Sequence, residues 1–228
     1  MSHPPARPRC FLNVAMSLDG KIASSRRELP AFASREDRRV MDRIRARADA
    51  VLVGAATLRT ADFPLRVHSR ALRRRRLASG RPEQPLNILL SSSLRVPLDG
   101  RFFTATDTRR LVVTLLTAPG DRLLKARTRA EVLAWKGKTI SLRRLMKELH
   151  GRGVRELLLE GGGTTNFEFF KAGLVDEIYL TLCPLVIGGA GSPTPADGAG
   201  FPPGGFRQFL PVRMFRKGAE VFLHYRRA

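Results

Sequence analysis

Strand-like and helix-like segments alternate along this chain, and the alternation limits its fold more than any other feature of the sequence. Short apolar runs bounded by turn residues are typical of buried strands. Such runs lie at residues 10–15, 50–54, 86–90, 111–115, 131–134, 154–159 and 175–182. Segments with helical patterns separate them at residues 34–47, 55–60, 121–126, 141–150 and 164–171. This order of elements predicts a parallel sheet covered by helices.

The last part of the chain breaks the alternation. A Gly- and Pro-rich stretch at residues 188–205 predicts a long loop. Two strand-like runs then follow at residues 208–213 and 220–225. They predict a hairpin that adds an antiparallel edge to the sheet. We expect an α/β fold with a mostly parallel central sheet, flanked by helices and ending in this hairpin, as a single domain over residues 1–228.

The charge of the chain points to anionic ligands. Lys and Arg number 41 against 20 Asp and Glu, which gives a net charge of +21. A field this positive attracts nucleotides, sugar phosphates and nucleic acids without choosing among them. The densest basic run, residues 70–76, is interpreted as a solvated loop, because no aromatic residue between Phe63 and Phe102 could stack on bases. Nucleic-acid binding through this run is the weaker alternative.

Several kinds of site are not expected. No apolar run is long enough for a transmembrane helix, and the polar residues 1–9 are interpreted as a loose tail without a signal region, which indicates a cytoplasmic protein. Cys10 and Cys183 are predicted to be buried free thiols. The four histidines show no metal spacing, and no nucleophile motif is present. We therefore expect no metal, and chemistry carried by a cofactor.

A glycine-rich turn after the predicted strand at residues 154–159 is the sharpest local signal. Its residues are Glu160, Gly161, Gly162, Gly163, Thr164, Thr165, Asn166 and Phe167. Glycines permit positive φ angles and a close approach of a ligand to the backbone, and amides at a helix N-terminus attract phosphate. Neither the GxGxxG fingerprint nor the P-loop pattern is matched. The turn is interpreted as a phosphate site, and the alternative is a tight turn that needs glycine only for packing.

Polar residues follow three other predicted strands. Asp19 and Lys21 follow the first strand, where they could bind a polar substrate or belong only to a turn. Thr57 follows the second strand in a short helix. Ser91 and Ser92 follow the third strand near an arginine, and hydroxyls beside arginine suit the 2′-phosphate of NADPH. Because parallel strands end at one edge of a sheet, we expect these turns to line one crevice.

Seven short motifs occur in an order that one family of reductases shares. They are NVAMSLDGK from Asn13, RIRA from Arg43, VGAAT from Val53, LRVP from Leu94, LEGGGT from Leu159, GLVDE from Gly173 and PLVIGG from Pro184. With these motifs the chain resembles the riboflavin-biosynthesis reductases of the RibD C-terminal type, over residues 11–225. The first motif, with Asn at position 13, is more similar to that of the stand-alone archaeal and fungal members.

This resemblance implies a dihydrofolate-reductase-like fold, a homodimer and an NADPH-dependent reaction. In that reaction the ribosylamino group of a pyrimidine ribose 5-phosphate is reduced to ribitylamino. The cofactor contacts implied by position are Ala15, Thr57, Ser91 or Ser92, Gly161, Gly162, Gly163, Thr164, Thr165, Asn166 and Phe167. The implied substrate contacts are Asp19, Arg45, Leu65 and Glu160. Reduction also needs a proton, and the candidate catalytic groups are Glu160, Asp19 and Lys21.

Two stretches depart from the family pattern near the implied substrate positions. Ala61 stands where the family often has the first Asp of an Asp-Asp-Pro run, and Leu29-Pro30-Ala31 replace polar and aromatic residues. The substrate is therefore open between the deaminated and the diamino pyrimidine. A reductase of the same fold that acts on a pterin or a small carbonyl compound is the alternative.

Overall fold

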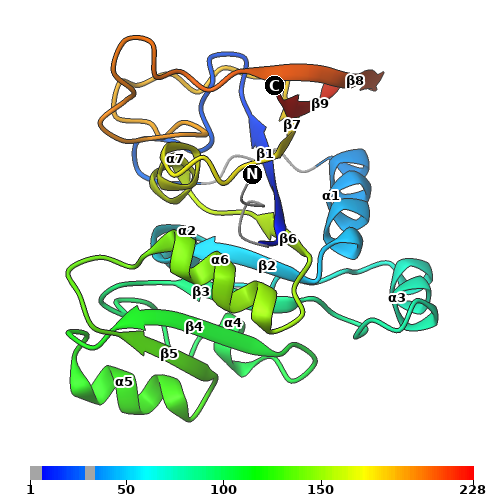
Figure 1. Ribbon diagram of the computed structural model, residues 1–228. Coiled ribbons are helices and arrows are strands. Elements are labelled where there is room, and N and C mark those ends of the chain that lie inside the picture. Colours follow the sequence, from blue (N-terminus) through cyan, green and yellow to red (C-terminus); the bar gives the residue numbers. More distant parts are fainter. Residues whose placement is uncertain (1–6, 29–33) are drawn as a thin grey trace, which may run out of the picture. The chain divides into compact units, whose positions relative to one another are not determined.

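The structure, a computed structural model, describes residues 7–28 and 34–228 (Figure 1). Most of the tail and the Leu29-Pro30-Ala31 departure lie outside the described residues. The chain divides into two compact units. Unit 1 is built mainly from Asp42–Leu158, and unit 2 consists of Arg9–Met41 and Leu159–Ala228. A single domain over residues 1–228 stays a prediction.

Unit 1 has five strands in the order β5-β4-β3-β2-β6. They are β2 (Ala50–Gly54), β3 (Leu86–Leu90), β4 (Arg110–Leu115), β5 (Glu131–Trp135) and β6 (Glu156–Leu159). The pairs β2–β3, β3–β4 and β4–β5 are parallel, as predicted. The helices of this unit are α2 (Ala55–Thr60), α3 (Arg70–Ala78), α4 (Arg101–Thr104), α5 (Gly120–Arg127) and α6 (Leu142–Gly151).

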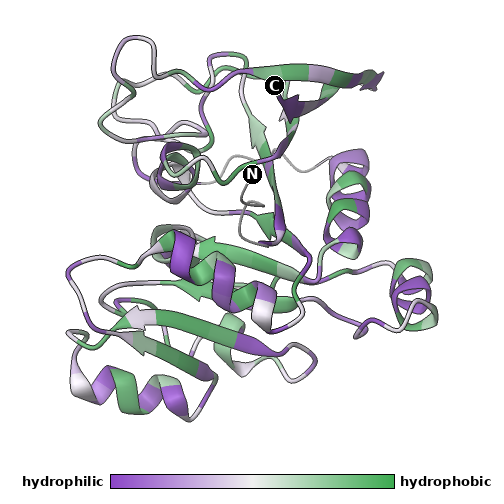
Figure 2. Cartoon of the chain, in the orientation of Figure 1, coloured by the Kyte–Doolittle hydropathy of each residue, from purple (hydrophilic) through white to green (hydrophobic). Residues whose placement is uncertain are grey.

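Helix α6 shows how these elements arise from the sequence. Its N-cap residue, Ser141, accepts a hydrogen bond from the Arg144 amide at 3.3 Å, which satisfies one amide of the first turn. Leu145, Met146 and Leu149 are buried, and Figure 2 shows hydrophobic and hydrophilic residues alternating along the helix. The amphipathic helix predicted at residues 141–150 is confirmed.

Unit 2 has four strands in the order β1-β7-β9-β8. They are β1 (Arg9–Met16), β7 (Glu177–Leu182), β8 (Phe209–Lys217) and β9 (Glu220–Arg227). β1 and β7 are parallel, while β7–β9 and β8–β9 are antiparallel. The mostly parallel arrangement and the C-terminal hairpin are therefore confirmed. Helix α7 (Gly163–Lys171) also lies in this unit, and α1 (Arg35–Arg47) begins here.

The interpretation of residues 70–76 as a solvated loop is wrong, because these residues form most of helix α3. The Ser69 side chain caps this helix by accepting a hydrogen bond from the Leu72 amide at 3.4 Å. Arg76 is only 3% exposed and donates to the carbonyls of Ala46, Ala48 and Pro82 at 2.9, 2.6 and 3.0 Å. A buried guanidinium needs such acceptors, so this arginine stabilises the fold.

Two further findings concern cysteines and membranes. Cys10 and Cys183 are free and buried, which confirms the prediction for both thiols. Among the residues that the structure describes, no helix is long and apolar enough to cross a bilayer.

Candidate functional site

The turn between β6 and α7 has the geometry of a helix N-terminus without a capping side chain. Gly162 is the N-cap residue, with φ −70° and ψ 169°. Since glycine has no side chain, it cannot satisfy the amides of the first helical turn, and those amides suit an anionic ligand. In this respect the turn fits the phosphates of a dinucleotide.

The glycines of this turn are needed for space rather than for positive φ. Gly161, Gly162 and Gly163 all lie outside the left-handed region. A Cβ atom on Gly161 would lie 2.9 Å from the Thr165 Cβ, and one on Gly163 would collide with the Asp197 carboxylate. Close packing therefore explains two of the three glycines, as the alternative interpretation of the turn supposed. It does not compete with ligand binding at the amides.

Asp19, after β1, holds the loop that follows β7. Its carboxylate accepts hydrogen bonds from the Ser17 hydroxyl at 2.5 Å and from the amides of Ile187 and Gly188 at 3.1 and 2.7 Å. These hydrogen bonds, chiefly that from Ser17, lower the pKa of Asp19 to about 2. The neighbouring Lys21 ammonium donates to the Ser192 carbonyl at 3.4 Å. Both candidate residues thus have contacts that hold the loop in place.

A group of carboxylates lies near Glu160, and the sequence did not single it out. The pKa of Asp37 is raised, mainly by burial and then by the negative charges of Glu220 and Glu160, although a hydrogen bond with Thr181 opposes the shift. The Ser34 hydroxyl donates to Glu220 at 2.6 Å. Residues 34–37 (Ser-Arg-Glu-Asp) have the form of a capping box at the start of α1, so the sequence indicates only a helix-capping role for Asp37. Ser34 does cap α1, by accepting from the amides of Glu36 and Asp37 at 3.1 and 3.0 Å.

Two of these carboxylates also affect Cys183, the residue that follows β7. Burial, followed by the charges of Glu220 and Asp37, raises the pKa of this thiol to about 12. Cys183 is therefore a neutral thiol at physiological pH, and it is not an activated nucleophile.

The β1–β7 pair places Ala15, another unit 2 candidate, near one end of the sheet. Ala15 pairs with Thr181, so both lie near the carboxyl ends of parallel strands. Ala15 and Glu160 are partly exposed, whereas Asn166 and Phe167 are buried. Within the described part of the chain, no group of His, Cys, Asp and Glu side chains could hold a metal ion.

The remaining candidates lie in unit 1. Thr57 in α2 is partly exposed, and Ser92 is exposed. Ser91 is buried, and its hydroxyl accepts from the Leu94 amide at 3.0 Å, so Ser92 is the more accessible of the two serines. Arg45 is 2% exposed and donates to the Arg66 carbonyl at 3.0 Å, and Leu65 is 3% exposed. Both implied substrate contacts of this unit are therefore buried side chains.

Comparisons with known proteins give consistent results. The model of the RibD C-terminal domain family matches residues 8–221. The chain is 40% identical to the 2,5-diamino-6-ribosylamino-4(3H)-pyrimidinone 5′-phosphate reductase of Archaeoglobus fulgidus, over 86% of this chain and 89% of that protein. A protein of the same name from Methanothermobacter thermautotrophicus is 34% identical, over 85% of this chain and 86% of its own.

Solved structures agree on the fold. A pyrimidine reductase-like protein from Corynebacterium diphtheriae superposes with a TM-score of 0.85 at 24% identity, covering 97% of this chain and 92% of that one. The riboflavin biosynthesis reductase of Saccharomyces cerevisiae gives a TM-score of 0.72 at 14% identity, covering 100% and 93%. The expected fold is therefore confirmed. Since the family model spans nearly the whole sequence, the chain belongs to the RibD C-terminal domain family.

Proposed function

We propose that this protein is an NADPH-dependent reductase of riboflavin biosynthesis. In this proposal it reduces the ribosylamino group of 2,5-diamino-6-ribosylamino-4(3H)-pyrimidinone 5′-phosphate to a ribitylamino group. One observation carries the proposal. The chain is 40% identical to a relative that is named as the reductase of that compound, and the match covers 89% of that relative. The uncapped N-terminus of α7, in a chain of net charge +21, supports it because both ligands carry phosphates.

Each unit has residues that are proposed to contact the cofactor. In unit 2 these are Ala15 and the turn from Gly161 to Phe167, whose first-turn amides would bind phosphate. In unit 1 they are Thr57 and the Ser91–Ser92 turn, where exposed Ser92 and Arg95 suit a 2′-phosphate. When bound, NADPH supplies the hydride. The preference for NADPH over NADH is part of the proposal and rests on this serine–arginine turn.

The substrate contacts proposed in unit 2 are Glu160, Asp19 and Lys21. The substrate contacts proposed in unit 1 are Arg45 and Leu65, whose side chains are buried. The proton is proposed to come from the carboxyl groups of Asp37 and Glu160. Asp37 suits this role because burial and neighbouring charges raise its pKa, whereas the low pKa of Asp19 keeps that residue ionised.

Steady-state assays with two substrates test the proposed activity. We expect NADPH oxidation with the diamino pyrimidine, and slower turnover with the deaminated pyrimidine. Turnover of only a pterin or a carbonyl compound would support a reductase of the same fold with another substrate. NADPH binding without turnover of either pyrimidine would reject the substrate assignment and keep the cofactor assignment.

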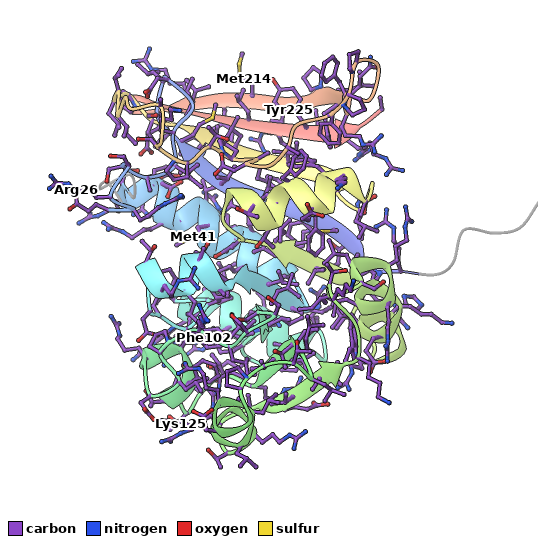
Figure 3. All side chains as sticks on the ribbon, turned by 90° about the vertical axis from the view of Figure 1, so that its left-hand side faces the viewer. Arg26, Met41, Phe102, Lys125, Met214 and Tyr225 are labelled. Carbon is purple, nitrogen blue, oxygen red and sulfur yellow. The ribbon has the colours of Figure 1, made fainter. Side chains whose placement is uncertain are left out.

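We further propose that the chain works in the cytoplasm as a homodimer. The support for a dimer is an apolar face in unit 2, on which Val14, Leu180, Leu223 and Met214 form one row across β1, β7, β9 and β8. The first three are partly exposed and Met214 is 73% exposed, with its side chain directed away from the ribbon (Figure 3). A second copy that covered this row would bury its apolar side chains in the centre of an interface.

A further inference from the structure

A short segment of the Gly- and Pro-rich loop packs directly on the first turns of α7. We call this segment, residues 192–201, the strap. The Asn166 side-chain amide donates to the Pro195 carbonyl at 2.8 Å. The ring centroids of Phe167 and Phe201 lie 5.2 Å apart. The strap thus contacts the α7 side of the predicted cofactor turn at two separate points.

The fit between the strap and α7 leaves no free space at two glycines. A Cβ atom on Gly163 would collide with the Asp197 carboxylate of the strap. A Cβ atom on Gly198, in the strap, would collide with the Phe167 ring. One glycine on each side of the contact therefore allows the two segments to touch, which indicates a built contact rather than a loop that lies against the helix by chance.

The strap is fixed to other parts of unit 2 as well. The Ile22 amide donates to the Pro193 carbonyl at 2.9 Å. Within the strap, the amide and hydroxyl of Thr194 donate to Asp197 at 3.0 and 2.8 Å. Outside it, the Arg207 guanidinium lies over the Phe201 ring, 5.3 Å from its centroid, so Phe201 contacts both this cation and Phe167.

Asn166 was expected to contact the cofactor, but its side chain points to the strap. It is 0% exposed. Its Nδ2 donates to the Pro195 carbonyl, and its Oδ1 accepts no hydrogen bond from the residues that the structure describes. A turn of three glycines has many accessible backbone conformations, so its amides need an external restraint to stay aligned for a ligand. The strap and Asn166 supply such a restraint.

We propose that the strap is a positioning element for the cofactor, with Phe201 and Asn166 as its positioning residues. This inference rests on the proposed function, because it assumes that the β6–α7 turn binds the dinucleotide. Phe201 and Asn166 act through the turn, by holding Phe167 and the first-turn amides in the shape that receives the phosphates. Loss of the restraint weakens cofactor binding, while the bound complex keeps its reactive geometry.

The test compares Phe201→Ala and Phe201→Leu with Phe206→Ala in the full chain. Phe206 is the matched control, because it also lies between β7 and β8 and is 70% exposed. We expect the Kd for NADPH, measured by fluorescence titration, to rise about tenfold in Phe201→Ala and about threefold in Phe201→Leu, with no change in Phe206→Ala. The kcat at saturating NADPH should stay within about twofold of wild type.

The outcomes separate three explanations. If Phe201 were merely structural, the variants would lose folded protein, and the Kd of the folded fraction would equal that of wild type. That result would overturn the inference, as would an equal rise in Kd in Phe206→Ala. If Phe201→Ala does not fold, Phe201→Leu decides by the same criterion. Wild-type protein that binds no NADPH would overturn both the strap and the proposed function, whereas normal wild-type binding with an unaffected Phe201→Leu would overturn the strap alone.

Discussion

Asp19 and Asp37 are aspartates of the same unit whose surroundings have opposite effects. Asp19 receives hydrogen bonds from one hydroxyl and two backbone amides, and these favour its charged form. Asp37 is partly buried near Glu160 and Glu220, which favour its neutral form. From the sequence, Asp19 is a candidate catalytic group, whereas Asp37 is not singled out. The structure favours a charged anchor for Asp19 and a proton-holding group for Asp37.

Asp19→Asn is expected to show a stability defect that depends on pH. A carboxyl whose pKa is lowered on folding stabilises the native state above its unfolded pKa of 3.8, and this contribution is lost as the pH falls toward about 2. The difference in urea midpoint between wild type and Asp19→Asn should therefore be constant above pH 4 and shrink below it. A difference that does not change between pH 5 and pH 2.5 would contradict the anchoring role.

Asp37→Asn is expected to have opposite effects on stability and on activity. A carboxyl whose pKa is raised on folding makes the native state less stable as the pH rises above 3.8. The amide should therefore leave the protein at least as stable as wild type at pH 7, measured by thermal unfolding. If Asp37 shares in proton delivery, kcat should fall about 100-fold. Unchanged kcat would remove Asp37 from the proposed proton source.

Helix α3 is an element that the sequence pattern did not predict, because its stabilising contacts come from the tertiary fold. The strands at residues 50–54 and 86–90 were predicted with their observed bounds, because a buried parallel strand is a continuous apolar run. The segment at 70–76 has no such apolar run and no aromatic residue nearby, and from the sequence it is interpreted as a solvated loop. Its stabilising contacts are carbonyls of Ala46, Ala48 and Pro82, which only the tertiary fold brings to Arg76.

Replacement of Arg76 should therefore destabilise the protein far more than replacement of its neighbour. Arg76→Leu leaves three carbonyls without their donor and is expected to lower the free energy of unfolding by about 2–4 kcal/mol. Arg75 is exposed, and Arg75→Ala should change it by less than about 0.5 kcal/mol. Urea denaturation of the two variants measures both values, and equal effects would contradict the structural role of Arg76.

At the candidate site, the sequence shows the glycine turn but not the contacts that depend on the tertiary fold. The glycine turn stands out because three consecutive glycines follow an apolar run and precede a predicted helix. The proximity of Asp37 to Glu160 could not be read, since more than a hundred residues separate them along the chain. The role of Asn166 was also hidden, because its partner is a backbone carbonyl in a loop without regular structure.

At the scale of the whole molecule, charge and apolar surface bear on assembly. A chain of net charge +21 repels its own copies unless an apolar face offsets the repulsion. The row that ends in Met214 carries no charge across four strands. The proposed dimer would use this face.

Light scattering after size exclusion tests this assembly. We expect a dimer for wild type, a monomer for Met214→Glu, and a dimer for Leu77→Glu. Leu77 is the matched control, because it is an exposed leucine, 55% accessible, on helix α3. A wild-type monomer, or a dimer that survives Met214→Glu and a second substitution, Leu223→Glu, would contradict the assignment of this face.

The central claim is that this chain reduces a phosphorylated ribosylaminopyrimidine with NADPH. Its most direct test follows absorbance at 340 nm after purified protein is mixed with NADPH and 2,5-diamino-6-ribosylamino-4(3H)-pyrimidinone 5′-phosphate, with the product identified by mass. We predict oxidation of one NADPH for each ribitylamino product formed, and faster turnover than with NADH. No loss of NADPH and no gain of two hydrogens in the pyrimidine, with protein that binds the cofactor, would contradict the claim.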